Sequence, residues 1–234
     1  MQRYFAVSKK NNEILLRNTD LYHIQKVMRM RSKDQIEAVL DEKLYLCELD
    51  MTNDLKIKVL NELPVETKKH YTTTLVVPIL KEAKLDLVLQ KATELGVDEI
   101  IVTPTERTIV KISAKEKNKL DRWETILKEA SEQSKRVTIP KIRYINSFKE
   151  LTNIDGLKIV CSTLICENIK TFLQTNSNCD KIVIVVGPEG GLSKDEENYL
   201  VSIGFNQISL GNLIMRVETV PINILSIINY EFME

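Results

Sequence analysis

The chain has 234 residues, with 33 lysines and arginines against 33 aspartates and glutamates. Its composition, 43% hydrophobic and 28% charged, is that of a folded globular protein and argues against disorder. No apolar run approaches the ~20 residues that span a membrane, and the N-terminus lacks the charged-then-apolar layout of a signal peptide. The four cysteines show no zinc-binding spacing, so we expect reduced thiols, a cytoplasmic location and no metal.

The zero net charge conceals four blocks of alternating sign. Residues 1–33 carry eight basic and two acidic side chains, and residues 67–149 carry seventeen and eleven. Residues 34–66 and 150–234 are acidic by the same margin of six charges. The two basic blocks could fold onto one face and bind a polyanion such as nucleic acid, although charge also fluctuates along ordinary chains.

The first 63 residues contain short β-rich runs separated by turn residues, with one helix between them. Strands are predicted at residues 4–7, 13–16, 35–40, 44–49 and 55–60. The helix is predicted at residues 20–30, with Asp20 as its N-cap. This order favours a small barrel. The polar residues 64–69 indicate a boundary, so we expect one domain over residues 1–70 and a second over residues 71–234.

The second part of the chain alternates strands and helices. Strands are predicted at residues 75–78, 99–103, 158–163, 182–186 and 207–210. Helices are predicted at residues 85–95, 115–137, 193–204 and 219–232. Ser193 and Glu196 have the spacing of a capping box, which marks the start of the third helix. The continuous apolar strands are typical of a parallel sheet, so the fold class is α/β.

Glycines mark the ends of two predicted strands. Gly187, Gly190 and Gly191 lie directly after the strand at residues 182–186, and Gly211 ends the strand that follows. The carboxyl ends of parallel strands are where α/β sheets bind ligands, and glycine lets a ligand approach the backbone. Neither segment matches a dinucleotide, P-loop, serine-hydrolase or zinc-protease motif. We expect one ligand pocket lined by both segments; two tight turns are the alternative.

Arg216 is the only arginine after Arg143, and Glu218 follows it just before the last predicted helix. An isolated arginine between a strand end and a helix start suits an anionic or electron-rich ligand. The alternatives are an ion pair between Arg216 and Glu218, or a contact at a subunit boundary.

A set of ordered motifs extends from about residue 2 to residue 228. Gly187-Pro188-Glu189-Gly190-Gly191-Leu192-Ser193 is followed by Leu210-Gly211-x-x-Ile214-Met215-Arg216-x-Glu218-Thr219. Upstream lie Arg3-Tyr4-Phe5, the segments 23–31 and 84–97, Glu106-Arg107 and the segment 129–136. Together they resemble the RsmE family of 16S ribosomal RNA uridine-N3 methyltransferases, in the SPOUT superfamily. Leu213 departs from the family pattern, which usually has arginine there.

The resemblance implies an N-terminal PUA-like β-barrel and a SPOUT-type parallel sheet with a C-terminal trefoil knot. It also implies S-adenosylmethionine as methyl donor, and 16S ribosomal RNA or the small ribosomal subunit as partner. A homodimer is implied as well, and the last helix is apolar on most of its circumference, as a dimer interface would require. The alternative is that this helix lies deep in the core of a single α/β domain, covered on every side by its own chain. Two rival functions are a catalytically silent RNA-binding protein of this fold and a knotted methyltransferase that acts on another RNA site.

By this resemblance, Glu218 is the candidate base toward uridine N3, and Arg216 would stabilise the anionic uracil. For Glu218 the alternative is charge stabilisation at the helix N-terminus. The residues expected to bind the donor are Thr163, Leu164, Gly187, Pro188, Glu189, Gly190, Gly191, Ser209, Leu210, Gly211, Ile214, Met215, Arg216 and Thr219. The residues expected to contact RNA are Arg3, His23, Lys26, Arg29, Arg31, Lys91, Arg107, Gln133 and Arg136, each of which could instead be an ordinary surface or packing residue.

Overall fold

The computed structural model describes residues 1–65, 69–108, 117–164 and 166–232. By its internal contacts the chain divides into two compact units. Unit 1 comprises residues 1–68 and 128–139, and unit 2 comprises residues 69–127 and 140–234. This division differs from a single break near residue 70, because the segment 128–139 packs with the N-terminal strands.

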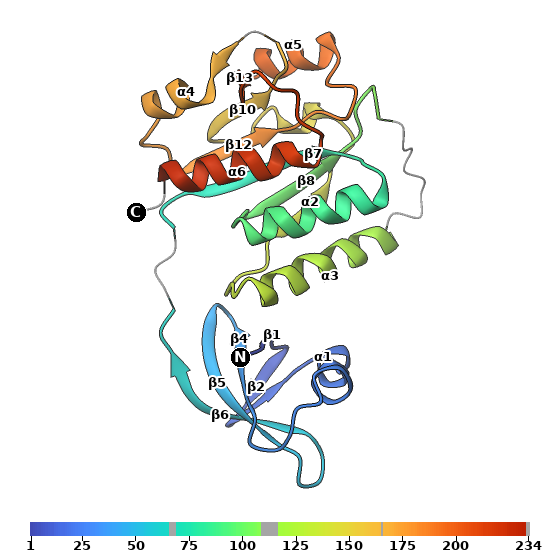
Figure 1. The fold of residues 1–234 in the computed structure, drawn as a ribbon, viewed down its shortest axis with the longest axis vertical. Coiled ribbons are helices and arrows are strands. Elements are labelled where there is room, and N and C mark those ends of the chain that lie inside the picture. Colours follow the sequence, from blue (N-terminus) through green and yellow to red (C-terminus); the bar gives the residue numbers. More distant parts are fainter. Residues whose placement is uncertain (66–68, 109–116, 165, 233–234) are drawn as a thin grey trace. The chain divides into compact units, whose positions relative to one another are not determined.

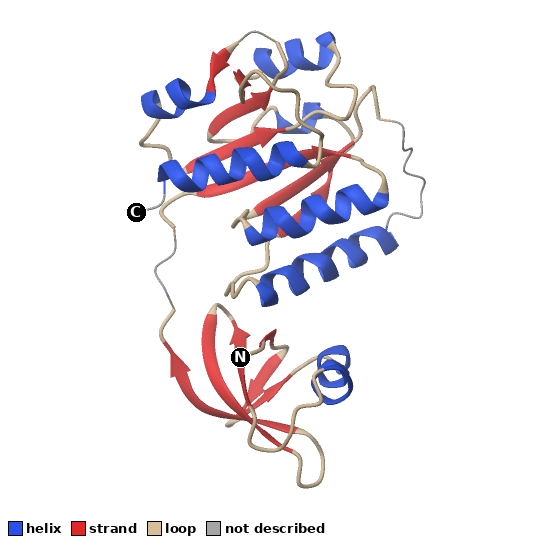
Figure 2. Ribbon diagram, in the orientation of Figure 1, coloured by secondary structure: helices blue, strands red, loops and turns tan. Residues whose placement is uncertain are grey.

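Unit 1 is built on a six-stranded sheet of order β1-β4-β5-β6-β3-β2 (Figures 1 and 2). Its strands are β1 (Arg3–Phe5), β2 (Ser8–Lys10), β3 (Glu13–Leu15), β4 (Gln35–Leu40), β5 (Lys43–Asp50) and β6 (Lys56–Leu63). β1 and β4 are parallel, and the other neighbouring pairs are antiparallel. Buried apolar side chains, among them Ile36, Cys47 and Leu49, form the core of this unit. Only β2 was not predicted, because its residues are polar and exposed.

The helix predicted at residues 20–30 is shorter and less regular in the structure. α1 covers Asn18–Tyr22 and continues into a π-helical turn, η1, at His23–Val27. The prediction of Asp20 as N-cap is wrong, because Arg17 occupies that position and Asp20 lies inside α1. Asp20 is buried, and its carboxylate accepts a hydrogen bond of 2.7 Å from Lys128 Nζ. Asp20, whose residue type suggests a helix cap, is therefore one partner of a buried ion pair.

The end of α3 (Lys117–Gln133) belongs to unit 1. This helix was predicted to reach residue 137, but Lys135 has a φ of 64°, a left-handed conformation that ends it earlier. Lys128 Nζ also lies 2.7 Å from Glu132 Oε1, and Glu132 accepts the backbone N–H of Phe5 at 3.0 Å. Burial raises the pKa of Glu132 against the opposing effect of Lys128.

Unit 2 contains a seven-stranded sheet of order β11-β13-β10-β12-β7-β8-β9, and all its neighbouring pairs are parallel. Its strands are β7 (Thr72–Pro78), β8 (Glu99–Thr103), β9 (Lys141–Tyr144), β10 (Leu157–Cys161), β11 (Glu167–Asn168), β12 (Lys181–Val185) and β13 (Asn206–Ser209). The prediction of a parallel α/β sheet is confirmed. β9 and β11 were not predicted, since one is an edge strand of half-buried residues and the other has two residues.

The helices of unit 2 flank this sheet. They are α2 (Glu82–Glu94), the first part of α3, α4 (Ile169–Thr175), α5 (Lys194–Ser202), α6 (Thr219–Phe232) and a 3-10 turn, η2, at Phe148–Leu151. α2 and α6 contact each other and lie in front of the sheet in Figure 1. The predicted capping box is present at the start of α5. Within the described residues, every helix is too short or too polar to cross a bilayer.

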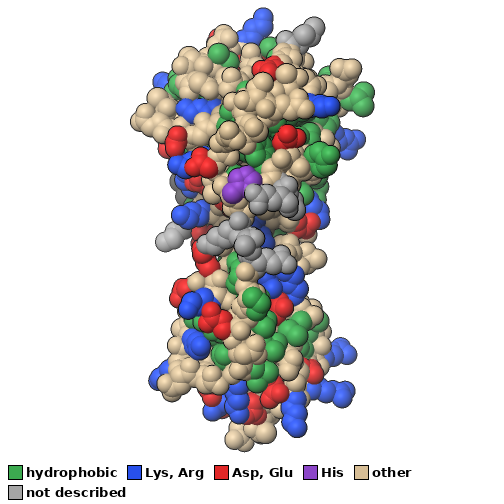
Figure 3. Space-filling model, turned by 90° about the vertical axis from the view of Figure 1, so that its left-hand side faces the viewer, with side chains coloured by type: hydrophobic (Ala, Val, Ile, Leu, Met, Phe, Trp, Pro, Cys, Tyr) green, Lys and Arg blue, Asp and Glu red, His purple; other side chains and the backbone are tan. Residues whose placement is uncertain are grey.

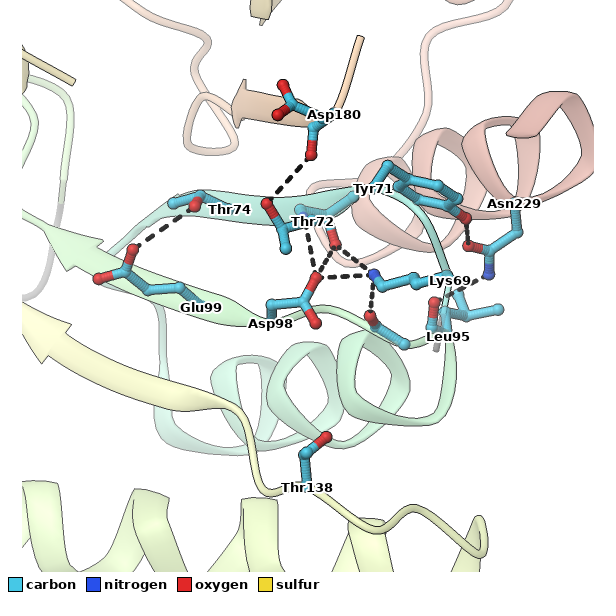
Figure 4. A network of polar contacts seen from close by, with 12 residues as sticks. Lys69, Tyr71, Thr72, Thr74, Leu95, Asp98, Glu99, Thr138, Asp180 and Asn229 are labelled. Carbon is cyan, nitrogen blue, oxygen red and sulfur yellow. Dashed lines mark hydrogen bonds and ion pairs between the residues drawn. The ribbon is translucent and has the colours of Figure 1, made fainter. Parts of the chain in front are cut away.

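A polar network joins the start of β7 to the ends of α2 and α6 (Figure 4). Lys69 Nζ lies 2.7 Å from Asp98 Oδ2 and donates to the carbonyl of Gly96 at 2.6 Å. Tyr71 donates its hydroxyl proton to Asn229 Oδ1 at 2.8 Å, and Asn229 Nδ2 donates to the carbonyl of Leu95 at 2.8 Å. These bonds satisfy backbone carbonyls that the end of α2 leaves without helical partners.

Candidate active site

A cavity of about 620 Å³ lies in unit 2, within the size range of small-molecule sites. Its walls come from three loops that follow β10, β12 and β13, which are neighbours in the sheet. Parallel strands end at the same edge of a sheet, so segments from residues 162–164, 186–192 and 210–217 meet there. The sequence-based expectation of one pocket, rather than two separate turns, is met by this geometry.

In the loop after β12, glycine suits different positions for different structural reasons. A Cβ at Gly187 would lie 3.0 Å from the backbone nitrogen of Leu192, and a Cβ at Gly190 would lie 3.4 Å from Arg107 Cδ. Gly191 has a φ of 70°, in the left-handed region. In the loop after β13, Gly211 has a φ of 126°, and a Cβ there would meet nothing within 4 Å. Two close approaches and two unusual backbone conformations thus shape the cavity wall.

Most of the residues expected to bind the donor line this cavity. They are Thr163, Leu164, Gly187, Pro188, Glu189, Gly190, Gly191, Leu210, Gly211, Ile214, Met215 and Arg216. Ser209 and Thr219 do not line it. Ser209 instead accepts a hydrogen bond of 3.3 Å from the backbone N–H of Gly211, and Thr219 is the first residue of α6. Ser209 therefore stabilises the loop that carries Gly211 without lining the cavity itself.

Several lining residues were not predicted from the sequence. Burial raises the pKa of the Cys161 thiol to about 12, so this side chain stays protonated and is no nucleophile at neutral pH. Glu197 on α5 accepts a hydrogen bond of 3.2 Å from Ser162 Oγ and one of 2.8 Å from Gln207 Nε2. The capping box at Ser193 could have suggested this role, because it places the first turn of α5 beside the glycine loop.

Lys84, in the first turn of α2, joins two carboxylates at the cavity. Its Nζ lies 3.0 Å from Glu189 Oε1 and 3.5 Å from Glu218 Oε2. The hydrogen bond to Glu189 raises the pKa of Lys84. Burial opposes ionisation of Glu189, but hydrogen bonds from its own backbone N–H and from Lys84 prevail and lower its pKa. Glu218 is only 16% exposed and does not itself line the cavity, so Lys84 connects it to the site.

Arg216 is exposed at the cavity, and its side chain makes no ion pair with any residue that the structure describes. Its carbonyl accepts the backbone N–H groups of Thr219 at 2.8 Å and Val220 at 3.2 Å, which starts α6. The alternative of an ion pair between Arg216 and Glu218 is absent, because Glu218 faces Lys84 instead. The guanidinium of Arg216 is therefore available to a ligand.

Arg107, expected to contact RNA, lines the same cavity. Its Nη1 donates to the carbonyl of Gly190 at 2.7 Å and to that of Leu192 at 3.2 Å. Lys91, also expected to contact RNA, pairs with Glu94 on its own helix at 2.9 Å.

The other residues expected to contact RNA belong to unit 1. Lys26, Arg29, Arg31 and Gln133 are exposed. His23 Nδ1 lies 2.9 Å from the Tyr4 hydroxyl, and Arg136 Nη2 donates to Thr138 Oγ1 at 3.4 Å. On the face drawn in Figure 3, basic and acidic side chains are interspersed.

The expectation for Arg3 needs correction. Arg3 is only 8% exposed, its Nε pairs with Glu37 at 2.8 Å, and its Nη1 donates to the carbonyl of Lys135. A guanidinium buried in this way stabilises unit 1 and cannot reach a phosphate. Its appearance in a basic N-terminal motif gave no sign of this, because Glu37 and Lys135 are distant in sequence.

No group of three or more histidine, cysteine, aspartate or glutamate side chains among the described residues could hold a metal ion. The four cysteines are free thiols. The cavity thus presents glycine-rich backbone, apolar side chains, one available arginine and a lysine held by two carboxylates.

Comparisons with known proteins identify the family of this chain. The model of the RNA methyltransferase domain family matches residues 67–229. Ribosomal RNA small subunit methyltransferase E of Bacillus subtilis is 33% identical, covering 99% of this chain and 97% of that protein. The protein of the same name from Mesomycoplasma hyopneumoniae is 30% identical, covering 97% of this chain and 98% of its own length.

Solved structures of methyltransferases are also similar to this chain. Ribosomal RNA small subunit methyltransferase E of Neisseria gonorrhoeae, solved with bound S-adenosyl methionine, has a TM-score of 0.88 and 25% identity over 98% of this chain and 97% of its own. A Legionella pneumophila protein described as a methyltransferase, solved with its cofactor SAM, has a TM-score of 0.89 and 25% identity over 97% of this chain and 96% of its own. The chain belongs to the RNA methyltransferase family and, within it, to the ribosomal RNA small subunit methyltransferase E (RsmE) group that its motifs indicated.

Proposed function

We propose that this protein transfers a methyl group from S-adenosylmethionine to N3 of a specific uridine in 16S ribosomal RNA. The observation that carries the proposal is the cavity at the ends of β10, β12 and β13, lined by the residues that the family motifs contain. Two relatives with bound S-adenosylmethionine share the whole fold with this chain. The reaction acts on ribosomal RNA, so we expect the protein to work in the cytoplasm.

The residues of the cavity fit this donor. Gly191 and Gly211 have positive φ, and the open space at the Gly211 Cβ position leaves room for a ligand against the backbone. Leu164, Leu210 and Ile214 offer apolar surface for an adenine ring. When bound, S-adenosylmethionine supplies a methyl group on a positively charged sulfur.

The chain's own residues have two tasks in the methyl transfer. They must hold the uracil N3 in line with the methyl group, and they must stabilise the ring as N3 loses its proton. Arg216 is the available cation for the developing negative charge. Glu218 is the candidate base, and its carboxylate lies 3.5 Å from Lys84 Nζ. A uridine must leave its base stack to bring N3 to this site.

The exposed cations of unit 1, Lys26, Arg29 and Arg31, are proposed to bind RNA phosphates. Gln133, His23 and Arg136 would complete this surface. A PUA-like barrel is proposed for unit 1, on the strength of its mostly antiparallel six-stranded sheet. The domains are proposed as residues 1–70 for RNA binding and residues 71–234 for catalysis, with the segment 128–139 of the second range packed in unit 1. A trefoil knot is proposed for the C-terminal segment, as the family resemblance implies.

A homodimer with residues of both chains at each active site is also proposed. The buried face of α6 carries Ile224, Leu225 and Ile228. On the opposite face, Ile227 is half-buried and Tyr230, three residues further on, is 87% exposed. These two side chains lie outside the core of the unit and support a second copy as partner. Sedimentation or solution scattering that shows an active particle of 26.9 kDa, the mass of one chain, would contradict the dimer.

The experiment that tests the function maps 16S ribosomal RNA modification in a strain that lacks this gene. We expect one uridine to lose its N3-methyl group, and the purified protein with S-adenosylmethionine to restore it on small subunits or naked RNA. A catalytically silent RNA-binding protein would give no heat of binding with the donor. A methyltransferase for another RNA site would bind the donor but leave 16S RNA unchanged.

A further inference from the structure

We propose that Arg107 is a positioning residue that holds the glycine loop, residues 187–192, in its donor-binding conformation. Its Nη1 donates to two carbonyls of this loop, at 2.7 Å to Gly190 and 3.2 Å to Leu192. One charged donor thus joins two points on either side of Gly191, whose φ is 70°. The inference rests on the proposed function, because it assumes that this loop binds the methyl donor.

The side chain of Arg107 also packs directly against Gly190. Gly190 does not have a positive φ, so its backbone conformation does not require glycine. A Cβ there would lie 3.4 Å from Arg107 Cδ and 3.6 Å from Arg107 Cβ, in van der Waals contact with the arginine side chain. The arginine stem therefore lies along the loop at this point, and the two residues fit each other.

A tight turn holds Arg107 in place. Thr108 donates its backbone N–H to the carbonyl of Thr105 at 3.0 Å, and Thr105 N–H donates to Thr108 Oγ1 at 3.0 Å. Between them, the backbone N–H of Glu106 donates to Glu196 Oε1 at 2.8 Å. Glu196 is the carboxylate of the α5 capping box, and its Oε2 accepts the N–H of Ser193 at 2.8 Å.

The turn at residues 105–108 is therefore bonded to both ends of one segment. Arg107 contacts the glycine loop, and Glu106 contacts the start of the helix that follows it. Such a double attachment fixes the loop before a ligand arrives and lowers the entropy lost on binding. Loss of the arginine should weaken donor binding even in the absence of RNA.

The test uses the full-length protein and S-adenosylmethionine in isothermal titration calorimetry without RNA. Arg107→Lys keeps the positive charge, but its side chain ends one atom short of the Nη1 position and cannot reach both carbonyls. We therefore expect donor affinity to fall by about tenfold or more. Hydrogen exchange of the amides at residues 190–192 should also become faster. Glu106→Ala is the matched control, because it removes the exposed neighbouring side chain and keeps the backbone N–H that Glu196 accepts.

A phosphate-contact role predicts the opposite pattern. Arg107→Lys would then keep normal donor affinity, and Arg107→Met would weaken only RNA binding; this result overturns the proposal. Thr108→Val provides a second variant, since it loosens the turn while Arg107 remains, and it should weaken donor binding without any change of charge. If the wild type itself binds no donor, the proposed function fails; if it binds and Arg107→Lys binds equally, only the role of Arg107 fails.

Discussion

Lys128 Nζ and Asp20 Oδ1 lie 2.7 Å apart, and both side chains are only 8% exposed. Glu132 completes the group at 2.7 Å from the same nitrogen. Tyr4 belongs to this environment, because burial, Glu132 and Asp20 together raise its pKa to about 12. The N-terminal strands and the end of α3 therefore share one buried polar group within unit 1.

Lys128→Met should destabilise unit 1. It leaves the carboxylates of Asp20 and Glu132 buried without their cation, and breaking a buried ion pair in this way typically costs about 3–5 kcal/mol. Urea unfolding followed by circular dichroism measures the loss. Lys43→Met, at an exposed lysine of the same unit, is the control. Equal midpoints for the two variants would mean that the buried pair contributes nothing.

Tyr4→Phe should change how stability depends on alkaline pH. The native state keeps the phenol proton up to about pH 12, whereas an unfolded tyrosine releases it near pH 10. Deprotonation thus favours the unfolded state, and the wild type should lose up to about 2 kcal/mol as the pH rises between these values.

Tyr4→Phe has no phenol proton at this position and lacks the loss of stability that its release causes. The difference in unfolding free energy between wild type and Tyr4→Phe should therefore change between pH 9 and 11.5. Urea midpoints across that range provide the measurement. Tyr22→Phe serves as the control, because Tyr22 is 62% exposed. A difference between wild type and Tyr4→Phe that stays constant with pH would contradict the account.

The regular elements of this fold were largely predictable, because local patterns determine them. β4, β8 and α6 have the predicted boundaries, and the capping box at Ser193 formed as expected. The wrong N-cap depended on a distant partner. Asp20 has the chemistry of an N-cap, but its partner Lys128 lies 108 residues away.

In the candidate site, too, features set by local sequence were predicted and contacts between distant residues were not. Glycines at the ends of predicted strands indicated the cavity, because their position after a strand can be read from the local sequence. Lys84 and Arg107 were either not assigned or assigned to RNA, because their contacts with Glu189, Glu218 and Gly190 cross between strands and helices. Lys84 and Arg107 belong to the family motifs, but the motifs could not show which residues each side chain contacts.

Gly211→Ala should weaken donor binding through backbone conformation. The φ of 126° at Gly211 is one that side chains rarely allow, and such strain costs about 1–3 kcal/mol. Relaxation of this strain would move the loop that lines the cavity. We expect at least about tenfold weaker binding of S-adenosylmethionine in calorimetry, and complete loss for Gly211→Val and Gly190→Val.

Gly96→Ala is the matched control for that substitution. Gly96 also has a positive φ, 82°, and open space around the Cβ position, but it ends α2 and does not line the cavity. It should lose stability and keep donor affinity. Similar donor affinity in Gly211→Ala and Gly96→Ala would show that the loop tolerates the strain.

RNA binding should weaken steeply with salt. If Lys26 and Arg31 each bind one phosphate, replacement of either by alanine should reduce the slope of log K against log salt by about 0.7–0.9. Lys56→Ala is the control, because Lys56 is exposed in the same unit and pairs with Glu13 at 3.7 Å. A flat salt dependence for the wild type would rule out phosphate contacts as the basis of binding.

Arg216→Ala should reduce turnover more than donor binding. The guanidinium is exposed at the cavity and unpaired within the described part of the chain, so it is available for the negative charge that develops on the uracil ring. Such a contact forms mainly in the transition state, so its loss lowers the rate and leaves ground-state affinity nearly unchanged. Removal of one preorganised contact of this kind typically costs about 10²–10³ in rate.

Calorimetry with S-adenosylmethionine and single-turnover methylation, on the same preparation, measure the two effects of Arg216→Ala. Arg143→Ala is the control, since Arg143 lies on β9 and its Nε pairs with Glu99 at 2.7 Å. If the Arg216 side chain only ordered the loop, its loss would shift the loop and the start of α6. Donor affinity and methylation rate would then fall together. A loop role is already disfavoured, since the backbone carbonyl of Arg216, not its side chain, holds Thr219 and Val220. A normal single-turnover rate would remove Arg216 from the mechanism and make Lys84, which lies 3.5 Å from Glu218, the next cation of the cavity to test.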